Sequence, residues 1–503
     1  MIAAMKYVKC FFLSFLVLLA NAVVFAQERS IDEYIQSAPF KMPSVTVPVF
    51  AKNVFSIVSY GAIGDGQSLN TKAFANTIDA CAAAGGGEVV VPPGIWLTGP
   101  IELKSNINFH VERGALVLFT PDKAQYPLIE SGKNSFSVMS PIYGANLENV
   151  AITGEGIFDG SGEVWRPLKK MKAIEAQWKK FVSSGGVVSK DGSVWWPSKE
   201  AMEGEAYLKK LKKEKTSSTA DDFLPARDFL RPKMVVLTNC KNVLLDGPTF
   251  KNSPNFVINP QKCTNLTIRN VQVNNEWWAQ NGDGIDISAC KNVVIYKTTV
   301  KAGDDGICMK SSGGKGLGKA ELENILIADC IVYQAHGGFV IGSNTDGGMN
   351  NIWVTNCNYI GTDVGIRVKS NSGRGGLVHN IFINNIYMHD IVNEAILFDT
   401  YYEDVQAGKR ASEVKTTVKD KIPEFTDFHI SNVFCNGAKQ AIKITGLPEM
   451  PVHHIYFNNL VISADKGFES KDAADIDLQK VRIIAKENPV FITNGCKNIN
   501  VHD

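Results

Sequence analysis

The segments CKNVLL (residues 240–245), CTNLTI (263–268) and CKNVVI (290–295) repeat one short pattern in the middle of the chain. In each segment an asparagine precedes an aliphatic residue, then any residue, then a second apolar residue. Such short alternation is typical of a β-strand with one buried face. The same pattern also begins at Asn149, Asn324, Asn351, Asn380 and Asn498.

The spacing of the asparagines decides between repeat architectures. From Asn242 to Asn380 the steps are 23, 27, 32, 27 and 29 residues. A period of about 20 to 50 residues indicates a solenoid, and a propeller blade would need about 40. Helical repeats are excluded because the units lack stripes with a period of 3.6. We therefore predict one all-β solenoid, a parallel β-helix over residues 53–503 after a lead-in at 27–52, with the asparagines at tight left-handed corners.

Both ends of such a solenoid need a cover, because an open coil exposes apolar core and strand edges. Residues 70–84 predict an amphipathic helix with Phe74, Ile78 and Cys81 on one face, and Gly85–Gly87 would end it. We expect this helix to cap the N-terminal end.

An insertion interrupts the repeat over residues 163–229 and is rich in lysine and tryptophan. Within it, residues 171–181 predict a helix that aligns Ile174, Trp178 and Phe181. Packing of the insertion onto the solenoid is the favoured role of its tryptophans, and stacking on sugar rings is the alternative.

The charge balance excludes one class of partner. The chain has 52 Lys and Arg against 51 Asp and Glu, a net charge of +1. Proteins that bind nucleic acid normally carry a clear excess of basic residues, so this balance does not indicate nucleic-acid binding. A content of 45% hydrophobic and 20% charged residues is typical of a globular protein. The lysine-rich run at 209–213 either meets an acidic partner or forms a solvated helix face, and we favour the solvated face.

The first 26 residues resemble a targeting segment. Lys6 and Lys9 precede an apolar run, Cys10 to Phe25. The run is followed by Ala26, with small residues where signal peptidase would cleave. We predict a signal peptide, residues 1–26, and export to the periplasm or the extracellular space, with no membrane attachment after cleavage. The alternative is a membrane anchor, but the run of 16 residues is shorter than the roughly 20 needed to span a bilayer.

The cysteines do not form the dense, even set of a disulfide scaffold. Removal of Cys10 with the signal leaves nine of the ten, an odd number, so at least one thiol stays free. Four of them each stand two residues before an asparagine of the repeat: Cys240, Cys263, Cys290 and Cys496. We expect most of the cysteines to be buried and structural.

Polar and charged residues share one register on four successive coils. The segments are DGIDI (283–287), DGICMK (305–310), GFVI (338–341) and GIRVK (365–369), and their aligned glycines are 22, 32 and 27 residues apart. Stacked strands lie about 4.8 Å apart, so these positions form a column. Side chains alternate across a strand, and those at Asp286, Lys310, Arg367 and Lys369 are therefore expected to point outward.

Three carboxylates stand at the head of this column, at Asp283, Asp304 and Asp305, with His336 nearby. Like charges so close together do not all ionise readily, so the pKa of one should rise. A raised pKa separates a proton donor from a base, as glycoside hydrolysis requires. Two bland alternatives remain, because Asp-Gly pairs are common turn formers and clustered carboxylates suit Ca²⁺.

These motifs resemble family 28 of the glycoside hydrolases, the polygalacturonases. That family has four ordered motifs, Asn-Thr-Asp, Asp-Asp after Gly or Gln, Gly-His-Gly and Arg-Ile-Lys. This chain has Asn281-Gly282-Asp283, Gly303-Asp304-Asp305, Ala335-His336-Gly337 and Arg367-Val368-Lys369 in the same order. The resemblance extends from about Phe55 to the C-terminus and implies a right-handed β-helix. Gly282, Ala335 and Val368 depart from the motifs without removing an ionisable group.

The resemblance also implies roles for these residues in inverting hydrolysis of α-1,4-galacturonosyl linkages in pectin. Asp304 would be the general acid, Asp283 and Asp305 would activate the water, and His336 would tune the acid. The residues expected to bind or position the substrate are Asn281, Lys310, Arg367, Lys369 and, more weakly matched, Tyr402. No metal and no cofactor are expected.

Two other classes of protein stay open at this point, a polysaccharide lyase that would use Ca²⁺ and a basic residue, and a non-catalytic adhesin or glycan-binding solenoid. The aspartate, histidine and Arg-x-Lys set favours the hydrolase. The insertion at 163–229 favours exo action, because a long loop beside the carboxylates can close one end of a groove. We expect a monomer.

Overall fold

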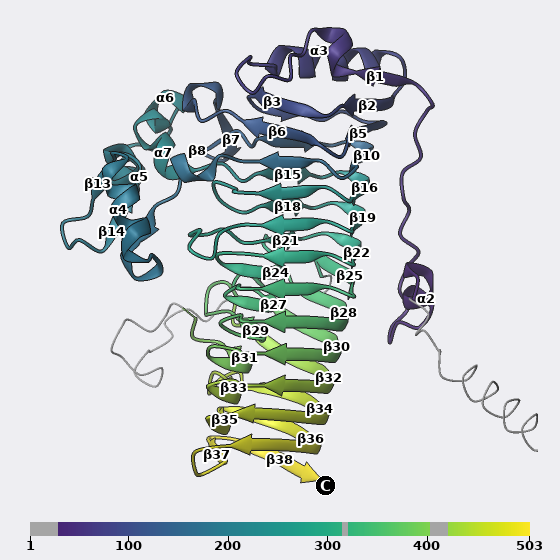
Figure 1. Ribbon diagram of the computed structural model, residues 1–503. Helices are drawn as coiled ribbons and strands as arrows, with labels where there is room; N and C mark the ends of the chain where they lie inside the picture. The colour runs from purple at the N-terminus through teal and green to yellow at the C-terminus, as the bar shows by residue number, and fades with distance from the viewer. Residues whose placement is uncertain (1–28, 314–319, 403–420, 503) are drawn as a thin grey trace, which may run out of the picture. The chain divides into compact units, whose positions relative to one another are not determined.

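The computed structural model (Figure 1) describes residues 29–313, 320–402 and 421–502. The chain divides into two compact units between Ala38 and Pro39, and each is described by itself. In the first unit a short helix, α2 (Ile31–Gln36), begins with a capping box between Ser30 and Glu33. The predicted signal peptide at 1–26 lies outside the described residues.

The second unit is a parallel β-helix, as the repeat predicts. Each strand pairs in parallel with its counterparts on the coils before and after it, in sheets of 21 and 12 strands, and the connections follow the usual right-handed crossover. The 12-stranded sheet contains β4 (Ile101–Glu102), β9 (Ile142–Ala145), β15 (Val235–Thr238), β18 (Ile258–Gln261), β21 (Ile285–Ser288), β24 (Asp305–Lys310), β27 (Gly337–Ile341), β29 (Ile366–Lys369), β31 (Glu394–Asp399), β33 (Gln440–Thr445), β35 (Lys466–Lys471) and β37 (Phe491–Asn494). The 21-stranded sheet contains β1 (Val54–Ser56), β2 (Gly87–Val91), β3 (Gly94–Thr98), β5 (Ile107–Val111), β6 (Ala115–Phe119), β10 (Glu148–Thr153), β11 (Ile157–Asp159), β16 (Lys241–Asp246), β17 (Thr249–Lys251), β19 (Thr264–Arg269), β20 (Gln272–Asn274), β22 (Lys291–Tyr296), β23 (Thr299–Lys301), β25 (Leu322–Ala328), β26 (Ile331–Tyr333), β28 (Met349–Ile360), β30 (Leu377–His389), β32 (Glu424–Asn436), β34 (Val452–Ala464), β36 (Ala473–Ala485) and β38 (Lys497–His502).

The repeated asparagines form a ladder along the solenoid. All of them have a positive φ, for example 55° at Asn242 and 56° at Asn265, the left-handed region that asparagine tolerates better than most residues. From Asn149 to Asn380 the side-chain Nδ2 of each donates to the Oδ1 of an asparagine one coil before, at 3.0 Å from Asn265 to Asn242 and 3.1 Å from Asn292 to Asn265. Asn498 donates instead to Asp475 Oδ1. The ladder therefore satisfies the polar corners and fixes the register of the coils.

The interior of the solenoid is apolar and continuous. Aromatic rings stack from coil to coil near the N-terminal end, with 5.1 Å between the ring centroids of Phe158 and Phe250. The nine cysteines of the described residues are all unpaired, and eight of them are buried. The prediction that most of the thiols are buried is confirmed, and they form no cross-links among the described residues.

The predicted N-terminal cap is present as α3 (Thr71–Ala83), which lies over the first coils at one end of the stack (Figure 1). Phe74, Ile78 and Cys81 are buried on its inner face, as predicted. The chain leaves the helix through Gly85, whose φ of 88° is in the left-handed region.

The insertion leaves the solenoid after β11 and returns before β15. The remaining elements between these strands are a three-stranded antiparallel sheet and short helices: β12 (Leu168–Lys169), β13 (Val187–Val188), β14 (Val194–Trp196), α4 (Glu175–Ser183), α5 (Lys199–Glu214), α6 (Ala220–Phe223), α7 (Arg227–Leu230) and the 3₁₀ turns η3 (Gly162–Val164), η4 (Lys170–Lys172) and η5 (Leu224–Ala226). Two 3₁₀ turns, η1 (Ile57–Tyr60) and η2 (Lys123–Gln125), precede the insertion. An antiparallel hairpin of β7 (Leu128–Gly132) and β8 (Ser135–Val138) also precedes it.

The helix predicted at residues 171–181 is only partly correct. The helix α4 begins at Glu175, because Lys170–Lys172 form the 3₁₀ turn η4 and Ile174 is extended at the N-cap. Ile174 is therefore 72% exposed rather than aligned with Trp178, which is buried. The lysines of the run at 209–213 lie on the exposed side of α5 and Leu211 is buried, as expected of a solvated helix face.

Candidate active site

Four neighbouring strands of the 12-stranded sheet carry the site. In β21, β24, β27 and β29 the register places Ile285, Ile307, Phe339 and Ile366 side by side, so the preceding glycines align as the sequence predicts. These apolar residues are buried in the core. The side chains between them in sequence point to the other face of the sheet, and the charged residues lie on that face.

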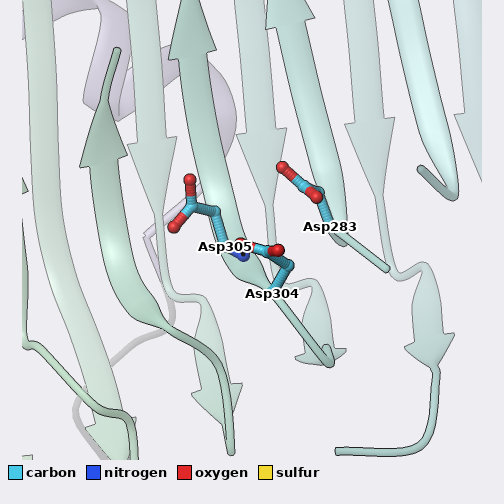
Figure 2. Close-up of side chains that lie close together, drawn as sticks. All are labelled: Asp283, Asp304 and Asp305. Atoms are coloured by element: carbon cyan, nitrogen blue, oxygen red, sulfur yellow. Dashed lines mark hydrogen bonds between the residues drawn. The ribbon is translucent and has the colours of Figure 1, made fainter. Parts of the chain in front are cut away.

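The three predicted carboxylates meet at the beginnings of β21 and β24. Figure 2 shows Asp283, Asp304 and Asp305 close together on one side of the strands. One oxygen from each lies within 4.8 Å of the others. Their burial differs, because the side chain of Asp304 is 20% exposed whereas those of Asp283 and Asp305 are 5% and 2% exposed. Asp304 is thus the carboxylate that a solute reaches most easily.

Asp305 is neutralised by the two cations of the predicted Arg-Val-Lys motif. Its Oδ2 lies 2.8 Å from Lys369 Nζ, and its Oδ1 lies 3.2 Å from an Arg367 guanidinium nitrogen. Gly337 stands opposite Asp305 on β27, and a Cβ there would lie 3.4 Å from the Arg367 side chain. The ion pairs therefore join β24 to β29 across the intervening strand β27, which carries Gly337 at this level.

The surroundings separate the pKa values of the three acids. Burial acts to raise the pKa of Asp305, but Lys369 and Arg367 outweigh burial and lower the pKa below its ordinary value. Burial also acts to raise the pKa of Asp304, but the hydrogen bond from His336 and the nearby positive groups, Lys369 among them, together outweigh it, so this pKa is lowered too. Burial and the neighbouring carboxylates raise the pKa of Asp283 well above its ordinary value. The expected raised pKa is present, and it belongs to Asp283.

A fourth carboxylate, Asp286, lies beneath the site. It faces away from the apolar core, as predicted, but it is fully buried, and burial raises its pKa. Lys310 Nζ lies 2.9 Å from Asp286 and 3.5 Å from Asp283. Lys310, expected to bind substrate, is thus also the counter-ion of two buried acids.

His336 contacts Asp304 through both its ring and its backbone. Its Nδ1 lies 3.1 Å from Asp304 Oδ1, and its backbone N–H donates to the Asp304 carbonyl oxygen at 2.8 Å. Its other ring nitrogen, Nε2, lies 3.0 Å from Lys172 Nζ and 3.6 Å from Asp363 Oδ2. The histidine is therefore placed to act on Asp304.

A cavity of about 480 Å³ brings most of the predicted residues together. The predicted residues that line it are Asn281, Asp283, Asp304, Asp305, Lys310, Lys369 and Tyr402. The Tyr402 ring lies 4.7 Å from Lys369 Nζ and 5.5 Å from the Arg367 guanidinium carbon. Arg367 and His336 border the acids from outside this lining, and His336 opens onto a second cavity with Lys172 and Asp363.

The carboxylate cluster is also close enough to hold a cation. However, Arg367 and Lys369 already contact both oxygens of Asp305, and Lys310 contacts Asp283. A metal ion would add a further positive charge beside these three cationic side chains and would be repelled at close range. The arrangement suits proton transfer next to an anionic ligand better than it suits metal binding.

Three basic residues of the site were not found from the sequence, namely Lys172, Arg231 and Lys233. A guanidinium nitrogen of Arg231 donates to Asn281 Oδ1 at 2.9 Å, and burial lowers the pKa of Arg231 to about 10. Lys233 lines the cavity and lies 2.8 Å from Asn259 Oδ1. These residues lie in the insertion or just after it, where no repeat marks the position of a side chain.

Comparison with known proteins agrees with this geometry. The chain is 27% identical over 452 residues to the exo-poly-alpha-D-galacturonosidase of Dickeya chrysanthemi, covering 86% of this chain and 71% of that protein. It is 25% identical over 356 residues to an endo-polygalacturonase of Pectobacterium parmentieri, covering 70% and 76%. The crystal structure of a hyperthermoactive exopolygalacturonase from Thermotoga maritima is similar with a TM-score of 0.68 and 29% identity, covering 84% of this chain and 89% of that one.

A family model covers the site itself. The model of glycosyl hydrolases family 28 matches residues 171–471, which include every acid, histidine and cation of the cluster. No helix among residues 29–313, 320–402 and 421–502 is long and apolar enough to cross a membrane. The chain belongs to family 28 of the glycosyl hydrolases.

Proposed function

We propose that this glycoside hydrolase cleaves α-1,4-galacturonosyl linkages in pectic polysaccharides. The observation that carries the proposal is the cluster of three carboxylates beside a cavity, one of them paired with both cations of the Arg-Lys motif. The acids supply proton transfer, and the cations suit a substrate that bears a carboxylate on every sugar. The names of the relatives support the same substrate class. The predicted export, from residues 1–26, is part of the proposal.

In the proposed mechanism Asp304 protonates the glycosidic oxygen. It is the most exposed of the three acids, and its Oδ1 is already engaged by the Asp305 N–H at 3.0 Å and by His336. Its Oδ2 is therefore the oxygen that would carry the proton to substrate. Asp283 and Asp305 hold and deprotonate the attacking water, and Asp305 stays ionised between its two cations.

The pKa order requires one further step in this mechanism. Without substrate, Asp283 and not Asp304 has the raised pKa. An anionic sugar beside Asp304 would add a like charge and exclude water, and both effects raise the pKa of a carboxyl group. We propose that substrate binding shifts the proton towards Asp304.

The stereochemical outcome is part of the proposal. The resemblance implies inversion, in which the two carboxyl groups usually stand about 6.5–9.5 Å apart, whereas a retaining pair stands about 5–5.5 Å apart. Here one oxygen from each acid lies within 4.8 Å of the others. We propose inversion, and the configuration of the sugar released first by the enzyme distinguishes inversion from retention.

We propose exo action, with release of monomers from a chain end. The insertion contacts the catalytic coils through Lys172 and Arg231, so it stands beside the acids rather than away from them. Most of its tryptophans pack within the protein, since Trp165, Trp178 and Trp195 are buried. Two of the similar proteins, from Dickeya chrysanthemi and Thermotoga maritima, are named as exo-acting enzymes, which supports the proposal. The protein from Pectobacterium parmentieri is named as endo-acting, which is the alternative.

A timed digest of polygalacturonate tests these proposals together. We expect galacturonic acid from the first time points, a slow fall in viscosity, and an inverted anomer by proton NMR. An early ladder of oligomers with a rapid fall in viscosity would contradict exo action. Products that absorb near-ultraviolet light would indicate a lyase, and no products on any pectic polymer would contradict the proposed function.

Arg367→Ala should weaken the binding of carboxylate-bearing substrate. Arg367 is the less buried of the two cations, with 17% of its side chain exposed against 5% for Lys369, and its Nε has no hydrogen-bond partner among the described residues. A lost charged hydrogen bond of about 1.5–3 kcal/mol corresponds to a rise in KM of roughly 10- to 100-fold. Methyl esterification of the substrate should have a similar effect, and the two changes should be less than additive.

The matched control for this prediction is Arg482→Ala, which removes an exposed arginine of β36, outside the residues that line the cavity. Its KM should equal that of the wild type on both substrates. Full additivity of Arg367→Ala and esterification would mean that Arg367 does not contact the substrate carboxylate.

A further inference from the structure

A lysine of the insertion reaches the histidine of the active site. Lys172 is the last residue of η4, and its Nζ lies 3.0 Å from His336 Nε2. The same ammonium donates to the carbonyl oxygens of Gly303, at 3.3 Å, and Trp277, at 3.4 Å. Gly303 directly precedes Asp304, so all three contacts hold Lys172 against the catalytic coil.

These contacts determine which nitrogen of His336 carries its proton. An ammonium group has donors only, so the nitrogen that faces Lys172 has to accept. A neutral imidazole has one donor and one acceptor, and with Nε2 accepting, the hydrogen resides on Nδ1. The Nδ1–H then points at Asp304 Oδ1, 3.1 Å away.

The tautomer matters because it decides which oxygen of Asp304 holds the acid proton. With Nδ1 as the donor, Oδ1 accepts from both His336 and the Asp305 N–H, and the proton resides on Oδ2. With the opposite tautomer, Nδ1 would be an acceptor and would draw the Asp304 proton to Oδ1. That proton would then face the histidine instead of the glycosidic oxygen.

The other charged group that faces Nε2 favours the opposite tautomer. Asp363 Oδ2 lies 3.6 Å from Nε2 and would accept from an Nε2–H. This separation is beyond hydrogen-bond distance, whereas the contact with Lys172 is within it. Arg231 donates to Asn281, whereas Lys172 is in hydrogen-bond contact with the ring.

We propose that Lys172 is a positioning residue that holds His336 in the Nδ1–H tautomer and so keeps the acid proton of Asp304 directed at the substrate. The effect on rate rests on the proposed function, but the tautomer itself does not. The insertion thus contributes to the chemistry and not only to the shape of the substrate site.

The test is a measurement of the ring nitrogens by NMR in protein labelled with ¹⁵N-histidine and free of substrate. The chain has eight histidines, and a His336→Gln variant assigns the signals. In the wild type we expect a protonated Nδ1 and an unprotonated Nε2. In Lys172→Met we expect protonation at Nε2 to appear, and Lys172→Arg, which again offers only donors, should restore the wild-type signature.

Kinetics supply the second readout. Lys172→Met should lower kcat about tenfold, a part of the roughly 10²- to 10⁴-fold that general acid–base catalysis contributes. KM should be nearly unchanged because Lys172 contacts His336 and two backbone carbonyl oxygens, not the groups proposed to bind the substrate. The matched control is Lys170→Met, on the same turn, whose Nζ lies over the Trp178 ring at 5.7 Å. It should leave both the signature and kcat unchanged.

Two results would overturn the proposal: a wild-type His336 protonated at Nε2, or a Lys172→Met variant with the wild-type signature. A correct tautomer in a protein that does not cleave pectic polymers would instead refute the proposed function and leave the positioning role intact.

Discussion

Asp304→Asn should reduce kcat by about 10²- to 10⁴-fold, the usual contribution of general acid–base catalysis. The carboxamide has the same shape as the carboxyl group but no acidic proton to give to the glycosidic oxygen. Its side-chain oxygen can still accept from the Asp305 N–H and from His336, so the fold and KM should stay close to wild type. Steady-state kinetics on oligogalacturonides, with circular dichroism to verify the fold, measure this effect.

An aryl galacturonide identifies the acid directly, because its leaving group departs without a proton. Asp304→Asn should recover much of its activity on that substrate, whereas the matched variant Asp283→Asn should stay inactive on both substrates. The reverse outcome would make Asp283, the carboxyl with the raised pKa, the proton donor. A loss of less than about tenfold for Asp304→Asn would remove it from the chemistry altogether.

Lys369→Met should lower the free energy of unfolding at neutral pH by about 3 kcal/mol, the lower end of the range for breaking a buried ion pair. Lys369 and Asp305 are both almost fully buried, 2.8 Å apart. The substitution leaves a buried carboxylate with one cation, Arg367, at 3.2 Å. Guanidinium unfolding at several pH values measures the loss, and Lys466→Met, an exposed lysine of the same sheet, is the control.

The loss caused by Lys369→Met should depend on pH in a definite direction. Because the folded-state pKa of Asp305 is lowered, its ion pairs stabilise the protein above the unfolded-state pKa of about 3.9. That stabilisation is lost as the pH falls towards the folded-state pKa. The difference between wild type and variant should therefore be largest at neutral pH and shrink below about pH 4. A difference that is the same at every pH would indicate a packing defect instead.

The solenoid was predictable because its signals repeat. One asparagine per coil, at a corner with positive φ, marks each turn of the chain, and the alternating aliphatic residues after it mark the buried face. The start of the helix in the insertion was not predictable in this way. An apolar spacing that includes Ile174 resembles a helix face, but the residue is extended and exposed, since η4 ends just before it.

The charged column of the site was predictable for the same reason, since strand alternation places Arg367 and Lys369 on one face opposite Asp305. The contacts made from the insertion were not. Lys172 and Arg231 reach His336 and Asn281 across more than a hundred and about fifty residues of sequence respectively. Only the folded insertion brings them there, and neither belongs to a repeated pattern.

The asparagine ladder has a consequence for how such a chain changes over evolutionary time. The bond from Asn242 to Asn149 spans 93 residues and measures 2.9 Å, and the bond from Asn265 to Asn242 spans 23 residues and measures 3.0 Å. The longer segment is about two doublings of the shorter one, and each doubling of loop length adds roughly 0.6 kcal/mol to the entropic cost of closing the loop. Since the ladder closes equally well over both, loops that leave the coil between two asparagine corners, as the insertion does between β11 and β15, can be lengthened, trimmed or exchanged between lineages at little energetic expense. New substrate preferences can therefore arise by grafting a loop, while the inherited acids stay in place.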